Sequence, residues 1–125
     1  MSATWRGGKK LTTGLVGLPV VSNSREVFMR LCKKFLSAVA VVPPTAAYRI
    51  EMERVTRHRL SVCEKHTDVA TIERTIGAGQ LEELIEDTKS ELEYVPEYAR
   101  SLAWQAYSDG SAKPVPIVVL PEGRH

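Results

Sequence analysis

The chain has 125 residues, of which 43% are hydrophobic, 26% charged and 6% aromatic, and this composition is typical of one globular domain rather than of a disordered or fibrous protein. Its net charge is only +2, and its longest apolar runs are much shorter than the ~20 residues that a membrane span needs. Cys32 and Cys63 lack CxxC spacing and are too few for a disulfide framework, so we expect two buried thiols.

The N-terminal segment is basic and free of acids. Residues 1–25 are rich in Ser and Thr and hold Arg6, Lys9, Lys10 and Arg25, with no acid before Glu26, which is the composition of a mitochondrial transit segment. The stretch GGKKLTTGLVGLPVV, residues 7–21, mixes apolar residues with glycines and a proline, a pattern typical of neither a strand nor a helix. We therefore expect residues 1–22 to form an extended arm.

Helical periodicity begins at Asn23. Apolar residues recur at spacings of three and four over 23–42. Ser22 or Asn23 marks the start, with Glu26 three residues after Asn23 as in a capping box, and Pro43 and Pro44 mark the stop. A second helix is expected from Pro44, in its first turn, to about Lys65.

Two further helices are expected after a short break. Thr67 and Asp68 are suitable N-cap residues for a helix over Val69–Ile76, which the following glycines end. The next helix covers 80–95, and Pro96 either kinks or ends it before a last helical piece at 97–107.

The C-terminal tail, residues 108–125, contains three prolines and has no helical period, so we expect it to run extended, with 117–120 able to form a short strand. The predicted fold class is all-α: a small antiparallel helical bundle over 23–107 with extended N-terminal and C-terminal arms.

The sequence offers little for catalysis or metal binding. Cys63 and His66 lie at i and i+3 on one helix, but a structural zinc site needs four such ligands, and nothing nearby in sequence would orient His66 as a base for a cysteine nucleophile. The glycines do not form a Walker loop or a GxGxxG motif. We predict no catalytic, cofactor-binding or metal-binding residue. The acidic run on the predicted fourth helix is expected to be a solvated face: Glu82, Glu83, Glu86, Asp87, Glu91 and Glu93.

A nucleic-acid function has weak support. Basic residues on the predicted second helix alternate with Glu51, Glu53 and Glu64, and residues 81–97 hold seven acids against Lys89 alone, whereas a DNA-binding face usually has a one-sided basic excess. We predict no nucleic-acid partner. The alternative that stays open is a free-standing helical module that binds an acidic partner or nucleic acid.

Three blocks in order resemble one known family. KKLTTGLVGLPV, PPTAAYRIEMERVTRHRL and DVATIERTIGAGQLEELIEDTKSELE are similar to the alpha-subcomplex subunit five family of mitochondrial NADH:ubiquinone oxidoreductase, respiratory complex I. The similarity covers roughly residues 9–95. Trp104 resembles the tryptophan-bearing C-terminal end of the family, whereas SAKPVPIVVLPEGRH departs from it.

This resemblance implies a non-catalytic accessory subunit without a redox centre. Its expected place is the matrix side of the mitochondrial inner membrane, on the peripheral arm near the core subunits around the quinone site, with other complex I subunits as partners and no transmembrane span. The arm would then be an anchor that buries its apolar side chains on a partner. The residues expected to contact partners are Thr12, Thr13, Gly14, Leu15, Val16, Gly17, Leu18, Tyr48, Arg49, Gln80 and Trp104.

Overall fold

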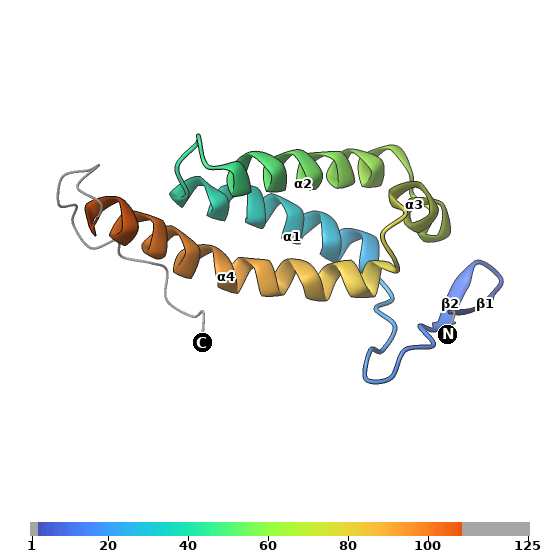
Figure 1. The fold of residues 1–125 in the computed structure, drawn as a ribbon. Coiled ribbons are helices and arrows are strands. Elements are labelled where there is room, and N and C mark those ends of the chain that lie inside the picture. Colours follow the sequence, from blue (N-terminus) through green and yellow to red (C-terminus); the bar gives the residue numbers. More distant parts are fainter. Residues whose placement is uncertain (1–2, 109–125) are drawn as a thin grey trace.

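The computed structural model describes residues 3–108, with side chains as far as residue 103. Three helices run lengthwise, a short helix crosses one end, and a two-stranded hairpin lies beside that same end (Figure 1). The predicted helical bundle is confirmed. The elements are β1 Thr4–Arg6, β2 Lys9–Thr12, α1 Ser24–Ala38, the 3-10 helix η1 Val39–Val41, α2 Ala47–Lys65, α3 Val69–Ile76 and α4 Leu81–Ser108.

Helix α1 is the centre of the bundle and packs against both α2 and α4. Its buried residues Phe28, Cys32 and Phe35 follow the spacing of three and four that the sequence shows. They belong to two clusters, one at the α3 end and one at the α1–α2 turn. The first contains Phe28, Cys32, Val62, Cys63, Ile72, Leu81, Leu84 and Ile85, and the second contains Phe35, Val39, Val42, Val95 and Ala99.

The ends of α1 differ in detail from the expectation. The helix gives way to a 3-10 turn at Val39, where β-branched valines precede Pro43 and tighten the last turn. At the N-terminus, Asn23 occupies the cap position without a side-chain capping hydrogen bond, so the predicted capping box is not formed. Glu26 instead pairs with Arg25.

Two arginines tie α1 and α2 together at opposite ends. Arg25, in the first turn of α1, donates from Nε to the carbonyl oxygens of Cys63 and His66 at the end of α2, at 3.0 Å each. Arg49, in the first turn of α2, donates from Nη1 to the carbonyl oxygen of Val42 at 2.8 Å, just after η1. A cation at a helix C-terminus satisfies carbonyls that have no partner within the helix.

Helix α2 begins at Ala47, so Pro44 lies in the preceding turn and not in the first helical turn as expected. The bounds predicted for α3 are confirmed: Asp68 caps its start by accepting from the backbone N–H of Thr71 at 3.0 Å. Gly77 ends it in the left-handed region, with φ of 68°, where a side chain would be strained.

Helix α4 continues through Pro96 to Ser108, so the separate last piece expected at 97–107 is part of one helix. Proline removes one backbone hydrogen bond and disfavours a helix interior. Here Pro96 is buried, and Val95 and Ala99 on either side of it are buried against Phe35, Val39 and Val42. Packing therefore maintains the helix across a residue that would otherwise break it.

The expectation that residues 7–21 contain neither a strand nor a helix is wrong for their first part. Lys9–Thr12 is a strand, paired antiparallel with Thr4–Arg6 in the register Trp5 to Lys10 and Arg6 to Lys9. Gly7 and Gly8 form the turn with φ of 57° and 80°, a conformation that glycine adopts without strain.

The tail was expected at 108–125, but Ser108 is the last residue of α4. Residues 109–125, with the optional strand at 117–120, lie outside the described residues, and the division into arm, bundle and tail stays a prediction. Between residues 3 and 108 no helix is long and apolar enough to cross a membrane.

Candidate functional site

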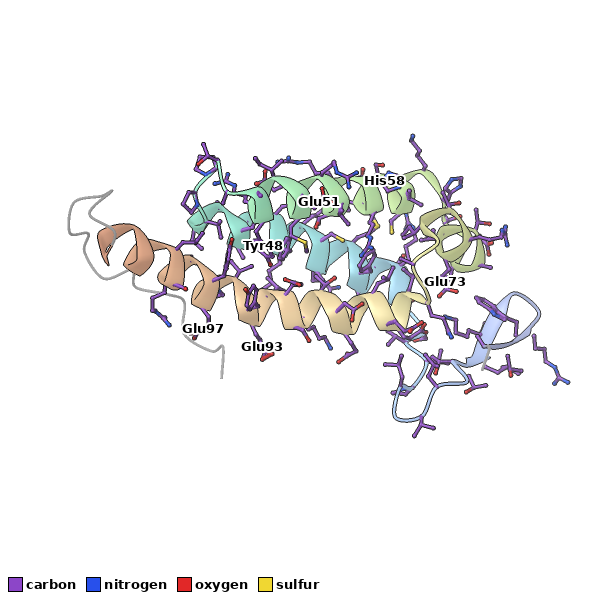
Figure 2. The ribbon with its side chains drawn as sticks, viewed as in Figure 1. Tyr48, Glu51, His58, Glu73, Glu93 and Glu97 are labelled. Carbon is purple, nitrogen blue, oxygen red and sulfur yellow. The ribbon has the colours of Figure 1, made fainter. Side chains whose placement is uncertain are left out.

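The residues expected to contact partners lie in several places. Thr12 and the loop 13–18 belong to the N-terminal arm, which we define as residues 3–22, and Gln80 precedes α4 beside it. Tyr48 and Arg49 lie in the first turn of α2. Figure 2 shows Tyr48 well away from the arm. Trp104 is in the last turns of α4, and its side chain lies outside the described residues. The structure therefore brings Gln80 to the arm and leaves Tyr48 and Arg49 apart from it.

The loop 13–18 is compact. Thr13 is buried, and its Oγ1 donates to the carbonyl oxygen of Leu18 at 2.5 Å and accepts from the N–H of Leu15 at 3.2 Å. Gly14 and Gly17 have φ of 75° and 77°, which lets the chain double back. The loop satisfies these polar groups internally while the side chain of Val16 is 97% exposed. It is thus a projection whose shape is held by its own hydrogen bonds.

Gln80 joins the loop to the bundle. Its Nε2 donates to the carbonyl oxygen of Thr13 at 2.7 Å, and its backbone N–H donates to Glu83 Oε1 at 2.9 Å. Its Oε1 is buried without a hydrogen-bond partner among the described residues. The side chain of Gln80, which was expected to contact a partner, therefore makes an intramolecular hydrogen bond through its amide nitrogen.

A buried ionic cluster lies next to this contact. Lys10 Nζ is 2.6 Å from Glu73 Oε2 and 2.5 Å from Glu82 Oε1, and the Glu82 side chain is 1% exposed. Glu82 Oε2 also accepts from the backbone N–H of Val21 at 3.2 Å. The expectation that Glu82 belongs to a solvated acidic face is wrong, because the arm covers it.

Tyr48 and Arg49 also make intramolecular contacts. The Tyr48 hydroxyl donates to Glu91 Oε2 on α4, and its ring lies 4.7 Å from that of Tyr98, centroid to centroid. Burial, followed by the hydrogen bond to Glu91, raises the pKa of Tyr48 well above its ordinary value. Arg49 Nε additionally contacts Glu53 at 3.0 Å. Tyr48 therefore fastens the start of α2 to α4, and Arg49 fastens it to the residues at the end of η1.

The cysteines are buried and reduced. Burial raises the pKa of the Cys32 thiol to about 12 and also raises that of Cys63, so neither is a ready thiolate at neutral pH. Over residues 3–103 the structure shows no group of three or more His, Cys, Asp or Glu side chains able to hold a metal.

The basic residues of α2 are largely matched by acids. Arg54 pairs with Glu51 and Arg57 with Glu53, as pairs along the helix surface. On α1, Arg30, Lys33 and Lys34 are exposed, and in the described part of the chain none of them has an ion-pair partner. These three cations are the feature that supports the alternative of an acidic partner.

Sequence reasoning missed the residues that hold the arm: Trp5, Lys10, Glu73 and the buried role of Glu82. Their contacts join segments separated by 63 and 72 positions, which no local pattern reports. A local signal existed only for the hairpin, since Gly7-Gly8 between two short runs is a common hairpin turn.

Comparison with known proteins identifies the class of protein to which the chain belongs. The fold is a small helical bundle with a folded arm, and residues 17–83 match the family described as the ETC complex I subunit conserved region. This match covers the end of the arm loop, α1 to α3 and the start of α4.

Relatives from several organisms then define the family. The chain is 47% identical over 83 residues to a probable NADH dehydrogenase (ubiquinone) 1 alpha subcomplex subunit 5, mitochondrial, from Arabidopsis thaliana, covering 66% of this chain and 49% of that protein. It is 34% identical to the Caenorhabditis elegans protein of the same family over 104 residues, 83% of this chain and 69% of that one. With the Bos taurus protein it shares 34% identity over 96 residues, 77% and 83% respectively. The chain thus spans about half the length of its plant relative and more of the two animal ones.

The chain belongs to the NADH dehydrogenase (ubiquinone) 1 alpha subcomplex subunit 5 family. Members of this family are accessory, non-catalytic subunits of mitochondrial complex I. The resemblance inferred from three sequence blocks is confirmed.

Proposed function

We propose that the chain is a non-catalytic accessory subunit of mitochondrial complex I. In this proposal it binds the matrix-facing peripheral arm of the complex near the core subunits around the quinone site, and it supports the assembly or stability of the machinery for NADH-to-ubiquinone electron transfer. The observation that carries the proposal is the match over residues 17–83, which includes Val21 of the arm and its partner Glu82 on α4.

The arm supports this role physically. Val16 is 97% exposed and Leu11 56% exposed, although both are aliphatic and lie in a folded segment. Burying one such side chain on a partner is worth about 1.5–3 kcal/mol before ordering costs are subtracted. Because the arm is folded against the bundle before binding, those ordering costs are reduced. The arm is therefore the part of the described surface that we assign to partner binding.

The native mass of the tagged chain tests the proposal. Mitochondria are solubilised gently and separated by blue-native electrophoresis, and the gel is stained for NADH dehydrogenase activity. We expect the tag to run with the active high-mass band. If the tag runs only as a small species, the proposal is refuted, and the exposed cations Arg30, Lys33 and Lys34 would favour a free-standing module for an acidic partner.

A surface variant tests the anchor separately. Val16→Asp changes a side chain that is almost entirely exposed, so the fold should be kept while incorporation falls about tenfold or more, the equivalent of ~1.4 kcal/mol. Ile50→Asp on α2, where Ile50 is 56% exposed, introduces the same charge on a distant surface and is the matched control. Normal incorporation of the Val16 variant would show that the loop is not the anchor.

A further inference from the structure

One lysine connects the arm to two helices of the bundle. Lys10, on β2, contacts Glu73 of α3 and Glu82 of α4, and its side chain is 4% exposed. The ring centroid of Trp5, its cross-strand partner on β1, is 5.3 Å from the Lys10 ammonium. The ammonium is thus enclosed by two carboxylates and an aromatic ring, each from a different element.

Two further contacts hold the arm on either side of the loop. Gln80 Nε2 donates to the carbonyl oxygen of Thr13 at the start of the loop, and the Val21 N–H after the loop donates to Glu82. Glu73 also accepts from the backbone N–H of Leu81 at 2.8 Å, so the carboxylate that holds Lys10 caps the start of α4 as well. These contacts hold the arm at the corner between α3 and α4, and Figure 1 shows the hairpin beside that end of the bundle.

The energetics of buried charge suggest what this cluster does. Taking charges out of water offsets most of the attraction between them, so a buried ion pair stabilises a fold little compared with apolar residues, and its clearest use is to specify one arrangement. The apolar core beneath it, built on Phe28, Ile72 and Leu84, does not include Lys10. The ionic cluster consequently fixes the position of the arm, while the apolar core supports the bundle.

The arm that is fixed in this way presents a surface of defined character. Arg6 and Lys9 are exposed, as are Leu11 and Val16, and residues 3–22 contain no acid. Lys10 is the arm's one cation whose charge is neutralised within the described structure. The surface is basic and apolar, and the complementary partner is a protein surface with an apolar recess and acidic groups around it.

We propose that Lys10 is the positioning residue of the arm: by joining Glu73 and Glu82 it holds residues 3–22 in one orientation, so that the arm docks as a preformed basic and apolar surface on a complex I subunit of the opposite character. This inference rests on the proposed function. It differs from the extended anchor expected from the sequence, because the binding shape exists before the partner arrives.

The test compares Lys10→Met with Lys9→Met in the full-length chain. Both changes remove one positive charge and keep an aliphatic stem, but only the first removes a cation from the cluster, since Lys9 is exposed. Arm position is followed by acrylamide quenching of Trp5, with Trp104→Phe introduced so that Trp5 is the single reporter, and by hydrogen exchange of residues 3–22.

We expect Lys10→Met to release the arm, because swinging it away lets Glu73 and Glu82 regain water. Quenching of Trp5 should rise about twofold, arm amides should exchange at least about tenfold faster, and the bundle amides should keep their protection. Lys9→Met should leave all three measurements at the level of the parent chain. If Lys10→Met leaves the arm protected, the positioning role is refuted.

Incorporation into complex I is then measured by the blue-native assay in chains that retain Trp104. We expect about a fivefold or greater loss for Lys10→Met and, at elevated ionic strength during assembly, a further loss for the parent chain as basic contacts are screened. Normal incorporation with a released arm refutes preformed docking. Absence of the parent chain from the complex refutes the proposed function instead, and the quenching and exchange results still decide whether Lys10 holds the arm.

A second variant covers the case in which Lys10→Met unfolds the bundle. Lys10→Met combined with Glu82→Met replaces the buried pair by apolar side chains, which such sites often tolerate without loss of stability. This chain should be folded by circular dichroism and should show either a released arm with poor incorporation, as expected, or a normally placed arm, which refutes the proposal.

Discussion

Replacing Tyr48 by Phe removes one hydroxyl and keeps the ring, so it isolates a single hydrogen bond between α2 and α4. The hydroxyl donates to the Glu91 carboxylate, and the ring packs against Tyr94 and Tyr98. A hydrogen bond to a charged group contributes about 1.5–3 kcal/mol net. Because Glu91 is only partly buried and regains water in the variant, we expect Tyr48→Phe to lower the free energy of unfolding by about 1–2 kcal/mol.

Thermal and urea unfolding at neutral pH measure this loss. For a chain of this size a loss of 1–2 kcal/mol corresponds to a Tm lower by roughly 4–8 °C. Tyr94→Phe is the matched control, since the Tyr94 ring belongs to the same aromatic cluster and its hydroxyl has no hydrogen bond within the described residues. It should change Tm by less than about 2 °C.

The pH dependence adds a second readout. Burial and the bond to Glu91 raise the pKa of Tyr48 in the folded state above the ordinary value of about 10, so above that pH the unfolded chain loses the phenol proton first. The contribution of Tyr48 to the free energy of unfolding is complete below pH ~10 and falls as the pH rises. It falls by no more than ~1.4 kcal/mol per pH unit, and by less than that because the ring is partly solvated. The difference in free energy of unfolding between the parent chain and Tyr48→Phe should therefore become smaller above pH ~10. Equal stability of the two chains at pH 7, or a gap that widens in alkali, would refute this reasoning.

Three further outcomes follow from the bundle. Ile72 is fully buried, so Ile72→Ala should cost about 2–5 kcal/mol in urea unfolding, whereas the half-buried Ile76→Ala on the same helix should cost less, and equal costs would contradict the assigned core. Cys32 and Cys63 should react with a thiol reagent at pH 8 at least about a hundredfold more slowly in the folded chain than in guanidinium, because burial raises the pKa of both thiols. Fast labelling of the folded chain would show that the thiols are accessible. The hydrogen bonds from Thr71 hold the pKa of Asp68 below its usual range, so the stability that this cap provides is present above pH ~4 and is lost as pH falls. Asp68→Ala should lower Tm at pH 7, and the difference should shrink in acid; a constant difference would exclude the charged cap as its cause.

The helices could be predicted because their signals are local. Asp68 and Gly77 mark the two ends of α3 by their own chemistry, and the stripe of Phe28, Cys32 and Phe35 reports the buried face of α1. Pro96 shows the limit of such signals. Its ring predicts a break in the helix, but the packing of Val95 and Ala99 against α1 and η1 maintains the helix. This packing joins residues far apart in the sequence, so no local pattern predicts it.

The candidate site depended on contacts between distant segments. Lys10 belongs to an acid-free arm and Glu82 to an acidic helix face that was expected to be solvated, and the burial of both side chains follows from their pairing. The sequence blocks did place Thr13 and Gln80 among the functional residues, and the structure joins them by a hydrogen bond. Their predicted contact with a partner stays a prediction.

The reciprocal arginines of α1 and α2 also limit how the chain can change in length. Arg25 contacts the carbonyls of Cys63 and His66 at the end of α2, and Arg49 contacts those of Ala40 in η1 and Val42 just after it. The distance along one helix must therefore match the distance along the other. A one-residue insertion within α2 would rotate the residues beyond it by about 100° and move them by ~1.5 Å, carrying Cys63 and His66 away from Arg25. Lysine at either position would supply the charge without the planar guanidinium, of which Nε in Arg25 and Nη1 in Arg49 each contact two carbonyl oxygens. The contacts of the two arginines therefore form only when α1 and α2 have matching lengths. The α1–α2 hairpin should accept substitutions on its outer face far more readily than insertions or deletions.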